Sequence, residues 1–355
     1  MGKVRVLLVE DSAVVRELLT HIVSSDPRLE VAAAVDSAEE ALRILPRLRP
    51  DVISMDIRLP GMSGLEATQR IMAEQPIPIV VIAGSVHSED LNIAMNALKA
   101  GALAVVEKPH GLSHDNYASE ASRICTQLYI MSDVSVIRQR RPQLEVTAGV
   151  SHTPTRVSAS RSGSPLALVG VVASTGGPNA LVQLLQGLGP EFNLPIAVVQ
   201  HISSGFHLGF VDWLNGVVPQ SVCVAEHGMV PQAGTVYVAP PDRHLELGPE
   251  RFRLDGSPPL KLQRPSGTRL FASLAVSLGS RAVGVLLTGM GDDGADGLVA
   301  LRNAGGYTIA EDASTCVVYG MPAAAVERGG VIESLPLTAI APRLLALCAR
   351  EEGVH

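Results

Sequence analysis

The sequence is poor in aromatic residues, and this scarcity limits how its core can be built. Only 3% of the 355 residues are Phe, Trp or Tyr, although 46% are hydrophobic. The core is therefore expected to rest on Val, Leu, Ile and Ala, a composition typical of parallel sheets buried on both faces. A chain of this length is too long for one ordinary core, so we expect two domains.

Cysteines and long apolar runs are also scarce. The 4 cysteines form no Cys-x-x-Cys pair, which argues against a zinc site and favours reduced thiols. The first residues, MGKVRVLLVEDS, lack the apolar stretch and cleavage site of a secretory signal. No run approaches the length of a membrane span. We therefore expect a cytoplasmic protein without direct membrane insertion.

Positive charge is in excess only in a short middle segment. The net charge is −5 over residues 1–125, +3 over residues 126–164 and −5 over residues 165–355. The acidic third segment is a poor match for nucleic acid, and no helix-turn-helix pattern supports a DNA-binding regulator. The middle segment is rich in Ser, Thr, Arg and Gln and contains several prolines, so we interpret it as a linker.

Strand and helix patterns alternate along residues 1–125. Helical spacing relates Val15 to Leu18, Leu19 and Ile22, and again relates Ile93 to Ala97 and Ala100. Repeated βα units predict a parallel sheet with helices on both faces. The predicted strands are residues 4–10, 31–35, 51–56, 78–84 and 104–108.

Charged residues stand at the ends of three of these strands. Glu10 and Asp11 end the first, Asp56 ends the third and Lys108 ends the fifth. Because the carboxyl ends of parallel strands share one edge, these side chains should meet. Clustered carboxylates favour Mg²⁺, and an Asp beside that ion can attack a phosphoryl donor. Each acid alone also suits a helix cap or a turn, but the joint pattern argues against that alternative.

Residues 3–125 resemble a response-regulator receiver domain, a flavodoxin-like (βα)5 fold, in the segments VEDS, MDIRLPGMSG and EKP. The resemblance implies that Asp56 is the phosphoacceptor. It further implies that Mg²⁺ binds to Glu10, Asp11, Asp56 and the Arg58 carbonyl, and that Lys108 contacts the phosphoryl group.

One position departs from the receiver pattern. The family usually has Ser or Thr five residues after Pro78, where it hydrogen-bonds the phosphoryl group, but this chain has Ala83. Ser85 would have to replace that hydroxyl from another position. Phosphate uptake is still expected, whereas its coupling to a conformational change is left open.

The second domain restarts the α/β pattern at residue 166. Strands are predicted at residues 166–174, 196–201, 282–289 and 307–311, with short β segments around Cys223 and at 235–240. Helices are predicted at residues 178–188 and 208–217, and residues 240–268 look irregular. The expected fold is a doubly wound, mostly parallel sheet.

Three of these strands stop at residues that suit hydrolysis. They end at Ser174, at His201 and just before the pair Asp292 and Asp293, the constellation of a hydroxyl, an imidazole and a carboxylate. The Gly-Gly-Pro sequence after Ser174 suits a tight turn into a helix N-terminus, but such turns are also common without catalysis. Spacing alone does not choose between the two acids and Asp296, which also suits a helix cap.

Residues 165–355 resemble the catalytic domain of the chemotaxis protein-glutamate methylesterases. The matching segments are ASTGGP, QH…GF, YVAPPDRH, RPS, LLTGMGDDGADG and CVVYGMP. The resemblance implies that Ser174 is the nucleophile, His201 the base and Asp293 the orienting acid. It also implies an oxyanion-hole donor at the Met290 backbone N–H and support from Thr175.

This resemblance also implies substrates, partners and regulation. The substrate would be a glutamate methyl ester of a methyl-accepting chemoreceptor, with glutamine deamidation as a second activity and no cofactor for the esterase chemistry. A chemotaxis-type histidine kinase would phosphorylate the receiver, which covers the active site until then. A binding module with an idle pocket is the alternative. The expected division is a receiver at 1–125, a linker at 126–164 and a catalytic domain at 165–355.

Two positions near the triad depart from this family. Val172 stands where the family usually has Gly, so we expect slightly different packing behind the nucleophile. Asp292 often corresponds to Asn, and its extra charge is expected to act on the ionisation of Asp293.

Overall fold

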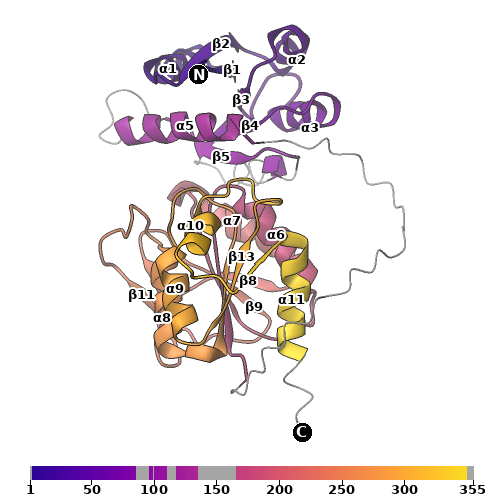
Figure 1. Cartoon of the computed structure of the whole chain (residues 1–355). Helices are drawn as coiled ribbons and strands as arrows, with labels where there is room; N and C mark the ends of the chain where they lie inside the picture. The colour runs from indigo at the N-terminus through magenta and orange to yellow at the C-terminus, as the bar shows by residue number, and fades with distance from the viewer. Residues whose placement is uncertain (1, 85–95, 99, 110–116, 135–164, 350–355) are drawn as a thin grey trace.

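Two parallel sheets, each covered by helices on both faces, form the computed structural model (Figure 1). It describes residues 2–84, 96–98, 100–109, 117–134 and 165–349. This architecture confirms the predicted α/β fold class. None of the helices within these ranges is long and apolar enough to cross a membrane.

The N-terminal domain (β1 to α5) contains a five-stranded parallel sheet in the order β2-β1-β3-β4-β5. Alternation along β1 sends Leu7 and Val9 to one face, and Val6 and Leu8 to the other. The strands are β1 (Val4–Val9), β2 (Leu29–Val35), β3 (Val52–Met55), β4 (Ile79–Ala83) and β5 (Ala104–Glu107). The helices are α1 (Ala13–Ser25), α2 (Ala38–Leu48), α3 (Gly64–Glu74) and α5 (Tyr117–Ser132).

Two sequence expectations for this domain are not settled by the structure. The helical spacing that includes Ile93 falls partly outside them, since Ile93 itself is not described. The last helix, α5, runs past residue 125 to Ser132. The domain boundary at residue 125 therefore stays a prediction.

The C-terminal domain (β6 to α11) contains a seven-stranded sheet in the order β14-β13-β12-β6-β7-β9-β8, and every neighbouring pair is parallel. The strands are β6 (Leu168–Ala173), β7 (Ile196–Gln200), β8 (Ser221–Val224), β9 (Thr235–Val238), β12 (Ala282–Leu286), β13 (Tyr307–Glu311) and β14 (Glu333–Leu335). The helices are α6 (Gly177–Leu188), α7 (Ser204–Val217), α8 (Gly267–Ser277), α9 (Ala295–Asn303), α10 (Met321–Glu327) and α11 (Leu337–Ala349), with a short 3₁₀ turn at Gly279–Arg281.

The two faces of this sheet are buried under different helices. On one face, Val169 and Val171 pack with Leu181 of α6. On the other face, Leu168 and Val172 of β6 pack with side chains of α8 and α9. Phenylalanine contributes more to the core than its abundance suggests, because four of its side chains are fully buried: Phe206, Phe210, Phe252 and Phe271.

Residues 240–268 contain regular structure that the sequence analysis missed. An antiparallel hairpin pairs β10 (His244–Leu247) with β11 (Phe252–Asp255). Both strands are short, and each offers only one pair of alternating apolar residues, Leu245 and Leu247 in β10 and Phe252 and Leu254 in β11. The helix predicted at residues 208–217 begins earlier, at Ser204.

The order of the strands decides where functional side chains gather. In each sheet there is a pair of neighbouring strands from which the chain adds further strands on opposite sides. This pair is β1 and β3 in one domain and β6 and β12 in the other. Crevices form at the carboxyl ends of strands at such points. Both predicted sites lie at these crevices.

Candidate functional site

Ser174 lies between β6 and α6, in a turn that depends on two glycines. Gly176 has a φ of 78°, in the left-handed region that suits glycine. A Cβ on Gly177 would lie 2.1 Å from Oε1 of Gln200. Gln200 donates from Nε2 to the carbonyls of Ser174 (2.8 Å) and His201 (3.0 Å). Gln200, which the sequence analysis did not single out, thus holds the two segments together.

His201 follows β7, the neighbour of β6, and its ring has one engaged and one free nitrogen. Nε2 lies 3.0 Å from Oδ2 of Asp293. An ionised carboxylate only accepts hydrogen bonds, so Nε2 carries the proton in this contact. Nδ1 is buried and has no hydrogen-bond partner in the described part of the chain. Because Ser174 and His201 line the same cavity, Nδ1 is the nitrogen left to receive a proton from the hydroxyl.

Asp293 is held by hydrogen-bond donors on both carboxylate oxygens. Oδ1 accepts from the Ser266 hydroxyl (2.7 Å) and the Thr268 N–H (3.1 Å), and Oδ2 accepts from the Gly267 N–H (2.6 Å). These residues form the N-terminus of α8, where free N–H groups and the helix dipole stabilise negative charge. The matching RPS segment was the only sequence signal for them, because the preceding stretch shows no periodicity.

These contacts determine how Asp293 ionises. Only 3% of the residue is exposed, and burial alone would raise its pKa. The hydrogen bond and charge of His201, together with donation from Ser266 and Thr268, outweigh burial, so the pKa of Asp293 lies well below its usual range. Asp293 is therefore ionised at neutral pH and can orient His201 and stabilise its protonated form.

Met290, in the segment after β12, and Thr175, which follows Ser174, line the same cavity. Thr288 anchors this segment, because its carbonyl accepts the Ser174 N–H (3.1 Å) and its hydroxyl donates to the Thr175 carbonyl (3.0 Å). The Thr288 N–H donates in turn to Oε2 of Glu311 (2.9 Å). Burial raises the pKa of the Glu311 carboxyl, which was not singled out in the sequence.

The other two candidate acids pair with cations instead of His201. Asp292 and Asp296 both pair with Lys261 (2.7 and 2.6 Å) and with Arg328. We call these four residues the ionic cluster. Hydrogen bonds from Lys261 and Arg328 lower the pKa of Asp292, and its charge is balanced by these cations. Of the three acids, only Asp293 contacts the imidazole.

Val172, the departure behind the nucleophile, packs closely against the start of α8. A Cβ on Gly267 would lie 2.3 Å from Cγ1 of Val172. The larger side chain on β6 is thus accommodated because its neighbour across the layer has none. Val172 is fully buried, as close packing of this kind requires.

The cavity around Ser174 also has walls from the N-terminal domain. Its volume is about 720 Å³, and its lining includes residues of β5 together with Arg123 and Gln127 of α5. Figure 1 shows β5 between the rest of that domain and the C-terminal domain. The Asn179 side chain of α6 donates from Nδ2 to the Leu98 carbonyl (3.0 Å). In this arrangement the N-terminal domain forms part of the wall of the cavity that holds Ser174.

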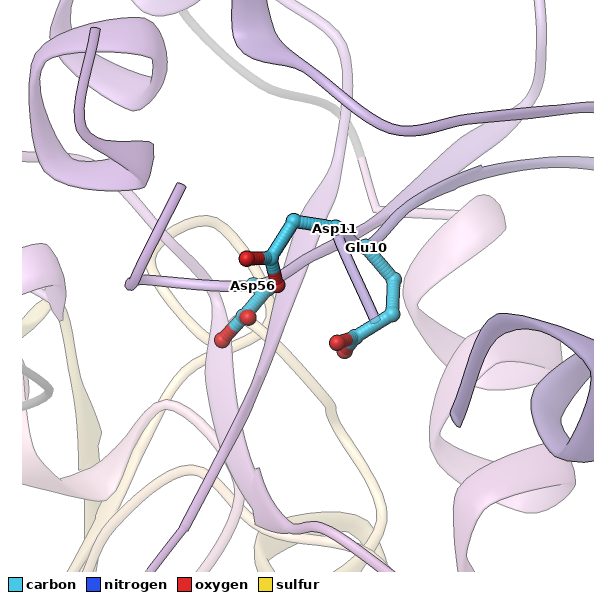
Figure 2. A group of neighbouring side chains, drawn as sticks. All are labelled: Glu10, Asp11 and Asp56. Atoms are coloured by element: carbon cyan, nitrogen blue, oxygen red, sulfur yellow. The ribbon is translucent and has the colours of Figure 1, made fainter. Parts of the chain in front are cut away.

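The predicted acidic site is assembled at the carboxyl edge of the first sheet. Carboxylate oxygens of Glu10, Asp11 and Asp56 lie within 4.8 Å of one another (Figure 2). Lys108 contacts Oδ2 of Asp56 (2.8 Å) and Oε2 of Glu10 (2.9 Å). Oxygen ligands at this spacing are the donor set that Mg²⁺ prefers.

These carboxyl groups are poorly compensated, unlike Asp293. Burial raises the pKa of Asp56, and the hydrogen bond and charge of Lys108 only partly oppose it. Burial and the neighbouring charge of Asp56 raise the pKa of Glu10. A divalent cation would remove this penalty, so the residues fit one.

Ala83 ends β4 beside this site and is 2% exposed. Its carbonyl accepts the Lys108 N–H (2.9 Å), which holds β5 and the lysine in place. Ser85, the alternative hydroxyl, lies outside the described residues.

Comparisons with known proteins match both domains. A family model described as CheB methylesterase matches residues 169–344, and one described as response regulator receiver domain matches residues 6–114. A relative from Paramagnetospirillum magneticum, named protein-glutamate methylesterase/protein-glutamine glutaminase 2, is 56% identical over 96% of this chain and 97% of its own length. A relative of the same activity name from Anaeromyxobacter dehalogenans is 42% identical over 96% of this chain and 98% of its own.

One solved structure covers the second domain. The Thermotoga maritima CheB methylesterase catalytic domain is 36% identical, with a TM-score of 0.50, and covers 52% of this chain and 100% of its own. This agreement places the parallel sheet and its helices in the same fold as that domain.

Proposed function

The chain belongs to the CheB methylesterase family, with a response regulator receiver domain at its N-terminus, and from this premise we propose that it is a phosphorylation-regulated protein-glutamate methylesterase and protein-glutamine glutaminase. The observation that carries the proposal is the contact of His201 with a deeply stabilised Asp293 in the cavity that also holds Ser174. A serine hydroxyl becomes nucleophilic when such a base removes its proton.

The reaction begins with attack of the Ser174 Oγ on the ester carbonyl while Nδ1 of His201 takes the hydroxyl proton. Asp293 holds Nε2 and stabilises the imidazolium that forms. The backbone N–H of Met290 stabilises the charge on the tetrahedral oxygen, and Thr175 supports the site. His201 returns the proton to the leaving oxygen, so methanol departs and an acyl-enzyme remains.

Water completes the cycle by the reverse sequence of proton transfers. His201 removes a proton from water, hydroxide attacks the acyl carbon, and the proton returns to Ser174 as the glutamate carboxylate leaves. A glutamine amide follows the same steps and releases ammonia in place of methanol. One site therefore serves both activities in the relatives' names.

The receiver supplies the regulation in this proposal. Asp56 accepts the phosphoryl group, Lys108 neutralises its oxygens, and Glu10, Asp11, Asp56 and the Arg58 carbonyl hold Mg²⁺, which supplies positive charge at the transferring group. Because β5 and α5 line the active-site cavity, a phosphorylated state that binds this face less well exposes Ser174.

The proposal extends to partners and boundaries. The substrate is a methyl-accepting chemoreceptor, the phosphodonor is a chemotaxis-type histidine kinase, and both meet the protein in the cytoplasm. The receiver occupies residues 1–125, the linker 126–164 and the catalytic domain 165–355. These assignments are supported by the family membership and by the cavity that both domains line.

The decisive assay is methanol release from methyl-labelled chemoreceptor membranes. Wild type should release methanol, and acetyl phosphate with Mg²⁺ should accelerate it. Ser174→Ala should release none above background under either condition. Equal release by wild type and Ser174→Ala would contradict the proposal.

A further inference from the structure

The lining of the active-site cavity includes part of an unusual turn at residues 260–263. Leu260 and Gln263 exchange two backbone hydrogen bonds (3.0 and 2.9 Å) across Lys261 and Leu262. Both central residues have positive φ, 51° and 65°. This is the pattern of a type I′ turn, whose central positions are normally Asn, Asp or Gly.

This turn is held in a costly conformation. A non-glycine residue in the left-handed region is strained and persists only where its surroundings hold it. The ionic cluster provides that restraint, because Lys261 pairs with Asp292 (2.7 Å) and Asp296 (2.6 Å). Asp292, which Lys261 contacts, directly precedes Asp293, so the turn is held in a fixed position relative to the triad.

The result of this restraint is an apolar side chain displayed in water. Leu262 is 94% exposed, and it lines the same cavity as Ser174, His201 and Met290. Met290 is itself 45% exposed. An isolated exposed leucine is ordinary, but one presented by a strained turn beside a reactive serine is not explained by packing.

The charged side chains next to this turn are paired with one another. The two cations of the ionic cluster pair with its two carboxylates, so the formal charges cancel. What the turn leaves available to a partner is the apolar side chain of Leu262. Lys261, Leu262 and Gln263 line the cavity that holds Ser174, so a protein substrate whose ester reaches Ser174 comes close to this turn.

We propose that Leu262 is a specificity-determining residue that contacts an apolar side chain of the protein substrate next to the esterified glutamate. This inference rests on the proposed function. It adds that the enzyme selects a glutamate by its apolar neighbour, through a contact that contributes to substrate binding more than to the chemical step. Removing a contact of that kind raises KM and leaves kcat largely intact.

The test compares Leu262→Asn, Leu262→Gly and Leu262→Met in the full chain. Asn and Gly suit positive φ, so both variants should fold and raise Tm slightly. With methyl-labelled receptor membranes, KM should rise about tenfold for both, a loss of about 1.4 kcal/mol. Leu262→Met keeps an apolar side chain and should stay within about threefold of wild type.

Two further measurements separate recognition from structure. The ratio of methanol release to 4-nitrophenyl acetate hydrolysis should fall about tenfold in Leu262→Asn, because the small ester has no flanking side chain. Val276, 89% exposed on α8, provides the matched control, and Val276→Ala should keep the wild-type KM. Unchanged KM in both Leu262→Asn and Leu262→Gly, with normal wild-type methanol release, would overturn this inference alone. Absence of methanol release by wild type would overturn the proposed function and the inference together.

Discussion

The two sites of this protein occupy equivalent places in two parallel sheets, yet the pKa values of their buried carboxyl groups are shifted in opposite directions. In the receiver, burial leaves the pKa of Glu10 and Asp56 raised. In the catalytic domain, Asp293 is also buried, but its pKa is lowered. Burial alone therefore does not decide ionisation at a strand end.

The difference comes from what surrounds each carboxylate. Asp293 receives three donors from the N-terminus of α8 as well as His201. Asp56 shares a single lysine with Glu10 and lies beside a second acid. Asp293 is therefore stabilised by the fold itself, whereas Lys108 only partly compensates the charges of Glu10 and Asp56, so a bound cation would stabilise them.

The largest expected effect separates the two sites completely. Asp56→Ala should abolish phosphate incorporation from radiolabelled acetyl phosphate, because it removes the attacking carboxylate. Ser174→Ala should incorporate phosphate as wild type does. Unchanged labelling of Asp56→Ala would refute the assignment of the phosphoacceptor.

The next effect concerns the catalytic carboxylate. Asp293→Asn keeps the shape of the side chain but no longer fixes the tautomer of His201, so kcat for methanol release should fall by roughly 10⁴-fold. Ser266→Ala, which removes one donor to Asp293, should cost far less. A loss below tenfold in Asp293→Asn would remove this aspartate from the mechanism.

The same substitution predicts a pH dependence of stability. Since the pKa of Asp293 is lower in the folded chain, its ionised form stabilises the fold above the unfolded value of about 3.9. That contribution to stability is lost as the pH falls through the pKa of Asp293 in the folded chain. Asp293→Asn should therefore lower Tm at pH 7, and the difference from wild type should shrink below about pH 4. A constant difference from pH 7 to pH 3 would contradict this linkage.

The receiver should respond in the opposite direction. A raised pKa means that these carboxyl groups bind protons more tightly in the folded chain than in the unfolded chain. The stability of the fold therefore falls as the pH rises from the pKa of the unfolded chain through the pKa of the folded chain. Without Mg²⁺, Asp56→Asn should therefore raise the Tm of the receiver transition by a few degrees at pH 7. Mg²⁺ should stabilise wild type more than the variant. Calorimetry with and without EDTA checks this, and a lower Tm for Asp56→Asn in EDTA would contradict it.

The smallest effect tests the contact between the domains. Asn179→Ala removes one hydrogen bond to the Leu98 carbonyl, so methanol release without phosphodonor should rise about threefold. Gln186→Ala is the matched control, because it removes a bond from the same helix to Val217 within the catalytic domain. Equal rates in the two variants would argue that this contact does not restrain the enzyme.

Sequence reasoning predicted the parts of both sites that depend on where strands end. Ser174 and His201 directly follow unbroken apolar strands, and parallel pairing brings such ends together. The residues that hold Asp293 were not predicted, because Ser266, Gly267 and Thr268 belong to another helix and no periodicity links them to β12. Spacing also could not choose among the three acids, since that choice depends on which of them the ionic cluster engages.

The hairpin of β10 and β11 was missed for a different reason. Its strands are four residues long, too short to establish an alternation. The turn at Leu262 was equally hidden, because Lys-Leu is not a sequence that favours two positive φ values. At this turn, the ion pairs of Lys261 with Asp292 and Asp296 hold a backbone conformation that the local sequence does not favour.

The most direct test of the central claim, that Asp293 and His201 activate Ser174 in a cavity partly walled by the receiver, is the rate of labelling by a fluorophosphonate followed by peptide mapping. The label should appear on Ser174, react more slowly by orders of magnitude in Asp293→Asn, and react faster in wild type after treatment with acetyl phosphate and Mg²⁺. Labelling at another residue, or the same rate in wild type and Asp293→Asn, would contradict the claim.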